Sequence, residues 1–210
     1  MLLQQNDAEY RRIQPSGLIY VLSVFEELRK GGLQGTLSLP ISSDSHIDPR
    51  SLVMFHWDDV LKRWNPLDRI SQSETTISSH ITEPGIYALF ADVEPPVIRN
   101  VSPADSKEVP LDRFFVEADI SDRGSDISQI RFMVDGKSVK YEYDPVIGHL
   151  TYFPSELEWG LHKMEITAMD RAGNVAEFST NFVTREVFQF ITVRAYPNPA
   201  KDNVNIEFKL

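Results

Sequence analysis

The chain has 210 residues, of which 41% are hydrophobic and 25% are charged, with a net charge of −10 and no cysteine. This composition is that of a globular protein long enough for two modest domains, and it argues against wholesale disorder. The acidic excess excludes the basic surface that nucleic-acid binding requires. The lack of cysteine excludes disulfides, thiolate metal sites and cysteine nucleophiles. No stretch reaches the roughly 18 uncharged apolar residues of a membrane span, so we expect neither a nucleic-acid partner nor a membrane-spanning segment.

Residues 1–92 are predicted to form a small all-β domain. The stretch GLIYVLSVFEELRKGG has apolar residues near helical spacing, but GLIYVLSVF is rich in β-branched and aromatic residues and lacks a strong N-cap, which favours a strand. LQGTLSLPI, RSLVMFHWDD, RWNPL and ETTISSHITEPGIYALFAD predict the strands that follow.

The acidic, proline-rich segment ADVEPP, residues 91–96, marks a boundary, because two adjacent prolines cannot join a sheet interior. In the next segment, Phe114, Val116, Ala118 and Ile120 alternate on one strand, and Ile130, Phe132 and Val134 alternate on the next. Asp135-Gly136 predicts a two-residue hairpin turn from which KSVKYEY returns. With HLTYF, HKMEITAMD and VAEFSTNFV, about seven strands with a turn near every tenth residue predict an immunoglobulin-type β-sandwich over residues 93–184.

The final segment, AYPNPAKDNVNIEFKL, predicts a rigid proline turn and then a strand with apolar residues at Val204, Ile206 and Phe208. A single strand cannot bury its apolar face alone, and the sequence offers it no expected partner strand. We therefore expect residues 185–210 to be a linker and the first strand of a truncated third module, and the chain to be a piece of a larger protein.

The second domain carries a resemblance to a known family. ISDRGSDISQIRFMVDGKSV, YDPVIGHLTYFP and LEWGLHKMEITAMDRAGN resemble, over residues 95–184, the immunoglobulin-like repeats of large bacterial extracellular and cell-surface proteins. Asp126-Ile127 stands where family members often have Gly-Ile. Through MFHWDDVLKRWNPL and GIYALFAD, the first domain resembles, more weakly, the β-domains that precede such repeats. YPNPAKDNVNIEF resembles the start of the C-terminal sorting modules of type IX secretion, or of their flagellar-hook-cap-like relatives.

Five polar residues are predicted to gather at one end of the second sandwich, because the loops that carry them lie at the same end of such a fold. These are Asp119, Asp122 and Asp126 in the first loop, and Asp170 and Asn174 in the second. Calcium takes six to eight oxygen ligands, so the set could form a calcium site. The reading that we favour needs no cofactor: Asp170 and Asn174 build the turn through local hydrogen bonds.

The step His80-Ile81-Thr82 resembles the His-Leu-Ser/Thr step at which some extracellular β-domains cleave themselves. The histidine would act as a base, and the hydroxyl would attack the preceding carbonyl. That chemistry also needs a strained backbone. We favour the alternative, in which His80 is a half-exposed strand residue and Thr82 begins a turn, so that the chain has no catalytic residue.

Conventional enzyme signatures are missing from the sequence. The histidines form no H-E-x-x-H pair, and there is no G-x-S-x-G elbow or phosphate-binding glycine loop. Trp57 and Trp64 would form a carbohydrate platform if exposed, but we favour their packing in the core of the first domain. His162, in a Gly-x-His turn, is expected to fix that corner by hydrogen bonding.

The sequence thus predicts an all-β chain of two consecutive β-sandwich domains, the second immunoglobulin-like. The resemblance implies a secreted or cell-surface bacterial protein. The expected role is that of a non-catalytic spacer or adhesion module whose partners are neighbouring domains of the same polypeptide, and beyond them a cell-surface glycan or protein. The alternative is a pair of accessory domains that help an extracellular hydrolase, such as a peptidase or glycosidase, to hold its substrate.

Overall fold

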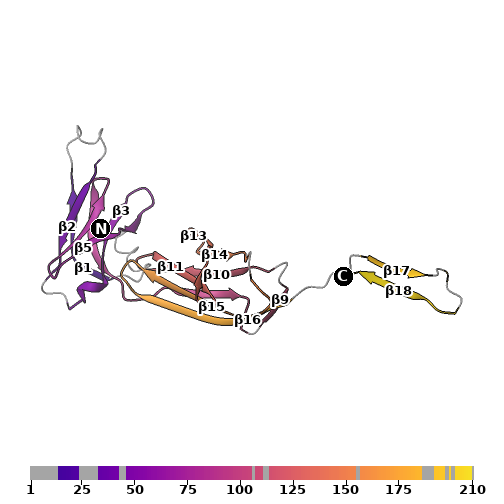
Figure 1. The fold of residues 1–210 in the computed structure, drawn as a ribbon. Coiled ribbons are helices and arrows are strands. Elements are labelled where there is room, and N and C mark those ends of the chain that lie inside the picture. The colour runs from indigo at the N-terminus through magenta and orange to yellow at the C-terminus, as the bar shows by residue number, and fades with distance from the viewer. Residues whose placement is uncertain are drawn as a thin grey trace.

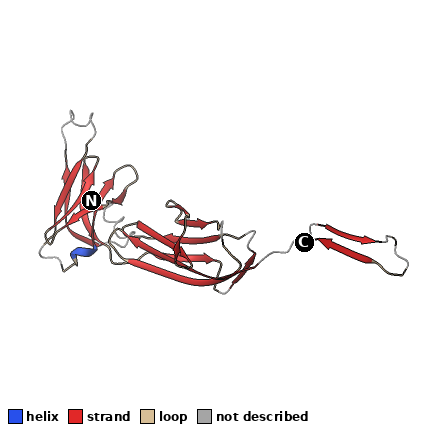
Figure 2. Cartoon of the chain, in the orientation of Figure 1, coloured by secondary structure: helices blue, strands red, loops and turns tan. Residues whose placement is uncertain are grey.

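The computed structural model describes residues 14–23, 33–42, 46–105, 107–110, 114–154, 157–185, 192–196, 199 and 202–209. Over these residues the chain consists of β-strands and connecting loops, with one short 3-10 helix at Pro49–Ser51 (Figure 2). The predicted all-β class is therefore confirmed. Within the same residues, no helix is long and apolar enough to cross a bilayer.

The first unit is a pair of antiparallel sheets (Figure 1). One sheet has the order β1 (Gln14–Leu22), β7 (Gly85–Ala91), β3 (Leu52–Asp58) and β4 (Arg63–Pro66). The other has the order β2 (Gly35–Pro40), β6 (Thr76–Ile81) and β5 (Arg69–Gln72). The prediction of a strand in GLIYVLSVF is confirmed by β1, whereas residues 24–32 lie outside the described part. β5 was not predicted, because RISQ contains a single apolar residue.

Strand β3 is buried on both faces, which fits its continuous apolar run from Leu52 to Phe55. Leu52 and Met54 pack between the two sheets. The opposite face carries a second group of buried side chains, which we call the aromatic cluster: Val53, Phe55, Trp57, Trp64, Ala88 and Phe90. The main sheet of the first unit therefore has a core on each side, and the second core lies away from its own partner sheet.

The second unit is a sandwich of immunoglobulin-like strand order. One sheet has the order β13 (Glu142–Asp144), β14 (His149–Tyr152), β10 (Val116–Ser121) and β8 (Val97–Ser102). The other has the order β12 (Lys137–Ser138), β11 (Ile127–Val134), β15 (Gly160–Asp170), β16 (Val175–Arg185) and β9 (Lys107–Pro110). β8 pairs antiparallel with β10, whereas β9 crosses to the other sheet and pairs parallel with the last strand, β16. The two sheets correspond to the ABED and CFG sheets of that fold, with one additional strand at each edge of the second.

The predicted alternation accounts for the core of the second unit. Val116, Ala118 and Ile120 of β10 are buried against Phe132 and Val134 of β11. At the predicted hairpin, Asp135 and Gly136 have φ of 50° and 73°, the left-handed region that such a turn requires. Strands β8 and β9 were not predicted, because their sequences VIRNVS and KEVP alternate weakly.

One predicted strand is corrected by the structure. KSVKYEY was expected to return beside β11, but only Lys137 and Ser138 do so. Glu142–Asp144 pairs instead with β14 in the opposite sheet. The chain crosses between sheets within this segment, and Val139 and Tyr141 pack against the core as it does so.

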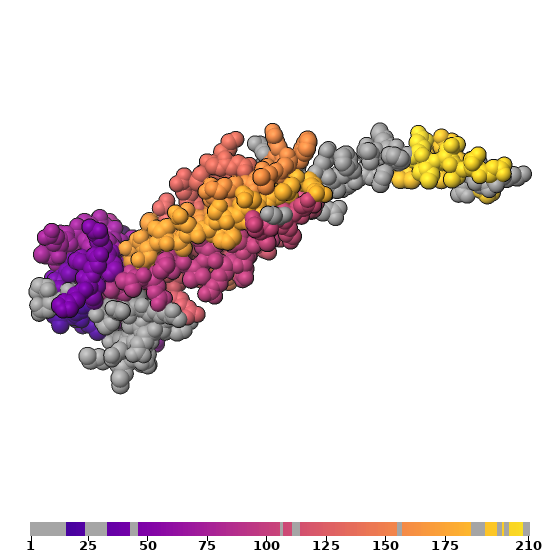
Figure 3. All heavy atoms as spheres, turned by 90° about the horizontal axis from the view of Figure 1, so that it is seen from below, coloured from indigo at the N-terminus to yellow at the C-terminus, as the bar shows by residue number. Residues whose placement is uncertain are grey.

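The C-terminal unit also differs from its prediction. The expected strand is present as β18 (Asn205–Lys209), but it has a partner: β17 (Thr192–Tyr196) pairs with it antiparallel. The prediction places residues 192–196 in a linker, because they precede the prolines, and it does not pair them with the strand that follows. Figure 3 shows this hairpin beyond the end of the second unit, while the first two units touch.

Candidate functional site

The end of the second sandwich that faces the first carries the turn between β15 and β16, residues 170–174. Arg171 Nε donates to Asp68 Oδ1 at 2.8 Å, and Arg69 Nη2 donates to the carbonyl of Arg171 at 3.4 Å. Ala172 packs against the aromatic cluster of the first unit. The Asp-x-Ala-Gly-Asn turn therefore joins the two units as well as closing its own hairpin.

Asp92, in the connecting segment, adds a second set of contacts between the units. Its side chain is fully buried. Oδ2 accepts a hydrogen bond from the backbone N–H of Ser125 at 2.8 Å, and Oδ1 accepts one from Glu94 N at 3.1 Å. Gly124 permits this approach, because a Cβ at that position would overlap the Asp92 carboxylate. The Nδ2 group of Asn174 donates to the carbonyl oxygen of Asp92 at 3.1 Å.

Three carboxylates meet at this junction, and we call Asp92, Asp122 and Asp170 the carboxylate triad. One oxygen from each lies within 4.8 Å of the others. Two oxygens bound to one calcium ion, each about 2.4 Å from it, lie at most about 4.8 Å apart. The spacing of the triad is therefore compatible with a shared divalent cation.

Burial makes the triad electrostatically unfavourable without a counter-charge. Asp92 and Asp170 are buried, and Asp122 is half-buried. Burial, together with the neighbouring carboxylates of Asp92 and Asp170, raises the pKa of Asp122 to about 7. Burial also raises the pKa of Asp170, although hydrogen bonds from Asn174 oppose the shift. A bound cation or a shared proton would each relieve this repulsion.

The structure brings together part of the predicted calcium set. Asp122 and Asp170 are in the triad. Asp126 donates its backbone N–H to Asp122 Oδ2 at 2.9 Å. Asn174 turns its Nδ2 group, not an oxygen, toward Asp170 Oδ2 at 2.8 Å, and its backbone N–H donates to Asp170 Oδ1 at 2.9 Å. The favoured turn-building contacts are thus present.

Asp119 does not belong with the other predicted ligands, which corrects the prediction. It lies on β10 before the loop, where its carboxylate bonds His149 Nδ1 at 2.9 Å and Asn100 Nδ2 at 2.7 Å. Asp92 is missing from the predicted set, because the sequence marks residues 91–96 only as a boundary between domains. Its position directly after the apolar strand GIYALFA was the available signal.

A groove of about 600 Å³ opens beside Asp122, one member of the triad. Asp122 and Asp126 line it from the loop, Arg171 from the turn, and Arg63 from the first unit. Tyr143 forms another part of its wall. An ion can therefore reach Asp122 from solvent at the boundary of the two units.

His80 and Thr82 are both exposed, and Ile81 between them is buried. His80 lies in the regular pairing of β6 with β2, opposite Thr36. In the described part of the chain, the non-glycine residues with positive φ are Lys62, Asn100, Asp126 and Asp135. The left-handed backbone geometry that could store strain thus lies elsewhere.

Trp57 and Trp64 do not form a carbohydrate platform. Their exposed fractions are 5% and 0%, and their rings contact each other edge to face at 5.4 Å. Trp64 also contacts Phe90, with ring centroids 4.9 Å apart. A sugar cannot stack on either ring, because both lie inside the aromatic cluster.

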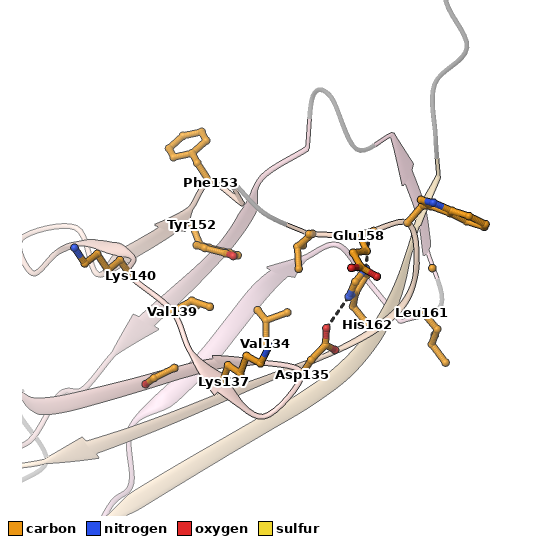
Figure 4. Close-up of a pocket in the computed structure, with 14 residues that line it drawn as sticks. Val134, Asp135, Lys137, Val139, Lys140, Tyr152, Phe153, Glu158, Leu161 and His162 are labelled. Carbon is orange, nitrogen blue, oxygen red and sulfur yellow. Dashed lines mark hydrogen bonds and ion pairs between the residues drawn. The ribbon is translucent and has the colours of Figure 1, made fainter.

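His162 fixes the far corner of the second sandwich, as predicted. Its Nδ1 lies 2.7 Å from Asp135 Oδ2, and its Nε2 lies 2.9 Å from the carbonyl oxygen of Glu158 (Figure 4). Thr184 Oγ1 is 3.0 Å from the same nitrogen. Burial acts to raise the pKa of Asp135, but the hydrogen bonds from His162 and the backbone N–H of Lys163, together with the nearby charges of His162 and Lys137, leave the pKa below its ordinary value. The side chain thus ties the turn after β11 to the ends of β15 and β16.

No protein-family model and no curated protein matches the chain. Among solved structures, it is similar to CopC from Methylosinus trichosporium OB3b, with 17% identity, a TM-score of 0.35, and coverage of 45% of this chain and 97% of that one. The fibronectin(III)-like modules of Clostridium thermocellum CbhA match with 13% identity, a TM-score of 0.35, and coverage of 72% and 86%. Dimeric latent PorU from Porphyromonas gingivalis matches with 11% identity, a TM-score of 0.35, and coverage of 84% and 24%. Such low TM-scores carry no functional argument, so the description of the sandwich rests on its strand order.

Proposed function

We propose that the chain is a non-catalytic spacer or adhesion module of a large exported bacterial surface protein, in which consecutive β-sandwiches are held in series. The observation that carries the proposal is the docking of residues 170–174 onto the first sandwich. Domains on a flexible linker are expected to move relative to each other. Here Arg171, Ala172 and Asp92 make polar and apolar contacts across the boundary, which favours a module that sets the distance and direction of its neighbours.

Small-angle X-ray scattering of the whole chain tests this role. We expect the parent to give one elongated particle whose radius of gyration is the same at low and high salt. Arg171→Ala should broaden the pair-distance distribution, because it removes the bond to Asp68. A parent profile that already requires many relative orientations of the two sandwiches would contradict a spacer with a fixed junction.

The alternative role is that of accessory domains of an extracellular hydrolase. An exposed pair of tryptophans would have favoured this role. Trp57 and Trp64, which would hold a glycan only if exposed, are buried. Binding of the whole chain to a panel of polysaccharides, measured by affinity electrophoresis, separates the two roles. Specific retardation would favour the accessory role, and its absence would favour the spacer.

We further propose that the carboxylate triad holds a divalent cation, for which calcium has the suitable ligand chemistry. Support comes from the 4.8 Å spacing, the burial of Asp92 and Asp170, and the groove that reaches Asp122. The ion would bridge the connector, the loop and the turn, so it would stiffen the same boundary. Isothermal titration of the chelator-treated chain with calcium should show one site. A heat no larger than that of dilution would contradict the cation site. The junction would then be held by the turn contacts without an ion.

The hairpin of β17 and β18 contains the segment, residues 196–208, that resembles the start of a type IX sorting module. We propose that it opens a sorting-type module, because a two-stranded sheet is marginally stable alone and requires further strands. Fusing the remaining strands of a type IX sorting module to this chain should produce an additional cooperative unfolding transition. A fusion with no additional transition would contradict the proposal.

A further inference from the structure

Strand β1 (Gln14–Leu22) is the outermost strand of the main sheet of the first unit. It pairs with β7 on one side, and no strand in the described part of the chain pairs with its other side. The backbone groups of an antiparallel strand point alternately to its two sides. The outer side of β1 therefore presents N–H and C=O groups to which a further strand can add.

Strand β1 lacks the charged side chains that protect most edge strands from such pairing. Its nine residues, QPSGLIYVL, include none. Among the edge strands that the structure describes, only β2 is also uncharged, and its exposed residues are glycine, threonine, serine and proline. All the others carry at least one arginine, lysine, aspartate or glutamate. The sequence thus leaves β1 as an unprotected edge.

The second half of β1 exposes apolar side chains at this edge. The exposed fractions are 73% for Leu18, 71% for Val21 and 43% for Ile19. Ile19 pairs with Ala88, which pairs in turn with Phe55 of the aromatic cluster. The same cluster contacts the second unit through Ala172. The apolar outer face of the sheet therefore continues from an established interface to the free edge, as expected of an interaction surface.

A second copy of the chain fits this edge, because the strand is complementary to itself. An antiparallel pair centred on Tyr20 places Leu18 of one copy opposite Leu22 of the other. Ile19 then lies opposite Val21, and the two-fold axis, perpendicular to the sheet, keeps both on the same face. Two chains that each carry a net charge of −10 repel each other, and β1 adds no charge to their contact.

We propose that two copies of the chain pair through β1 as antiparallel strands, with Tyr20 on the two-fold axis, so that the main sheet continues across the dimer. Such an interface uses the same patch on both copies. A contact of one strand per copy is small beside the roughly 1,200–2,000 Å² of stable interfaces, so the dimer should exchange with the monomer. Pairing joins two spacers side by side through their first units. It uses none of the contacts of Arg171 or Asp92, so it and the proposed junction fail separately.

Sedimentation velocity over a range of concentrations tests the pairing in the full chain. We expect the parent to pass from monomer to dimer as its concentration rises. Val21→Lys should raise the dissociation constant of the dimer at least about tenfold, because it brings an ammonium group into an apolar contact. Val60→Lys should leave the constant unchanged, because Val60 is 89% exposed on the turn between β3 and β4. A parent that stays monomeric at millimolar concentration, or a dimer that Val21→Lys leaves intact, would overturn the proposal.

Two single-cysteine variants test the register of the pair. The chain has no cysteine, so an introduced one can form a disulfide only with a second copy. Tyr20→Cys lies on the axis, where the paired Cα atoms are about 4.5–5.5 Å apart, a separation that a disulfide spans. Leu18→Cys is the control, because its two copies are offset by about 13 Å along the strands. On mild oxidation, Tyr20→Cys should give several-fold more disulfide-linked dimer than Leu18→Cys. Equal yields would overturn the proposal.

Discussion

Asp92 Oδ2 lies 2.8 Å from the backbone nitrogen of Ser125, so a side chain from the connector closes the end of the second sandwich. The bond joins positions 33 residues apart. It requires a carboxylate at position 92 and no Cβ at position 124, next to Ser125, since Gly124 leaves room for Asp92. The junction is thus part of the folded core, and substitutions there should change both stability and interdomain geometry.

Gly124→Ala isolates this contact. A methyl group would overlap the Asp92 carboxylate, so we expect the free energy of unfolding to fall by about 1–3 kcal/mol, as for an overpacked core site. Gly35→Ala is the matched control, because a Cβ at position 35 meets nothing within 4 Å. Urea denaturation measures both variants, and equal effects would refute the close approach.

Calcium should raise the melting temperature of the chelator-treated chain, because it binds the folded triad and not the unfolded chain. At about 100 times the dissociation constant, the gain is about 2.7 kcal/mol. Asp122→Asn should abolish the rise. Asp119→Asn should preserve it, because Asp119 bonds His149 and Asn100 away from the triad. Loss of the rise in Asp119→Asn alone would contradict the assignment of ligands.

Without calcium, the raised pKa of Asp122 predicts a pH dependence of stability. Between the ordinary aspartate value near 3.8 and about 7, the folded chain holds a proton at Asp122 that the unfolded chain has lost. The contribution of Asp122 to stability therefore falls as pH rises through this window. Asp122→Asn should become more stable relative to the parent as pH rises from 4 to 8. A difference in melting temperature that is constant with pH would argue against the shift.

The two histidine–aspartate pairs of the second sandwich should differ in their contribution to stability. His162 is buried and contacts Asp135, Glu158 and Thr184, so we expect His162→Ala to cost about 2–4 kcal/mol. The pair of His149 and Asp119 is about 40% exposed, and His149→Ala should cost less than about 1 kcal/mol.

The stability that the pair of His162 and Asp135 provides should depend on pH. The pKa of Asp135 is lowered, so its contribution is present above the ordinary value near 3.8 and is lost as pH falls through the folded value. The difference in unfolding free energy between the parent and His162→Ala should therefore shrink in strong acid. A difference that grows as pH falls would assign the stabilisation to another group.

Local patterning predicted most strands, because alternation within one strand depends only on which face is buried. Val116, Ala118 and Ile120 show this directly. It failed where pairing is not local. KSVKYEY divides between two sheets, and β17 pairs with β18 across the proline turn, which no pattern within either segment reveals.

Only part of the candidate site could be predicted, because strand order locates loop residues but not a residue of the connector. Asp122 and Asp170 lie in loops that the fold brings to one end, so strand order located them. Asp92 enters from the connector, and its place depends on how the first unit docks. Trp57 and Trp64 were judged correctly as core residues, but the sequence could not show that their cluster lies on the outer face of the sheet, against Ala172 of the next unit.

The central claim is that the two sandwiches are held in one fixed orientation, and a distance distribution between them tests it most directly. Because the chain has no cysteine, spin labels can be placed at Glu74→Cys in the first unit and Ser179→Cys in the second, both exposed positions. Double electron–electron resonance should give one narrow distance peak in the parent and a broader one after Gly124→Ala. A broad distribution in the parent that Gly124→Ala leaves unchanged would contradict the fixed junction.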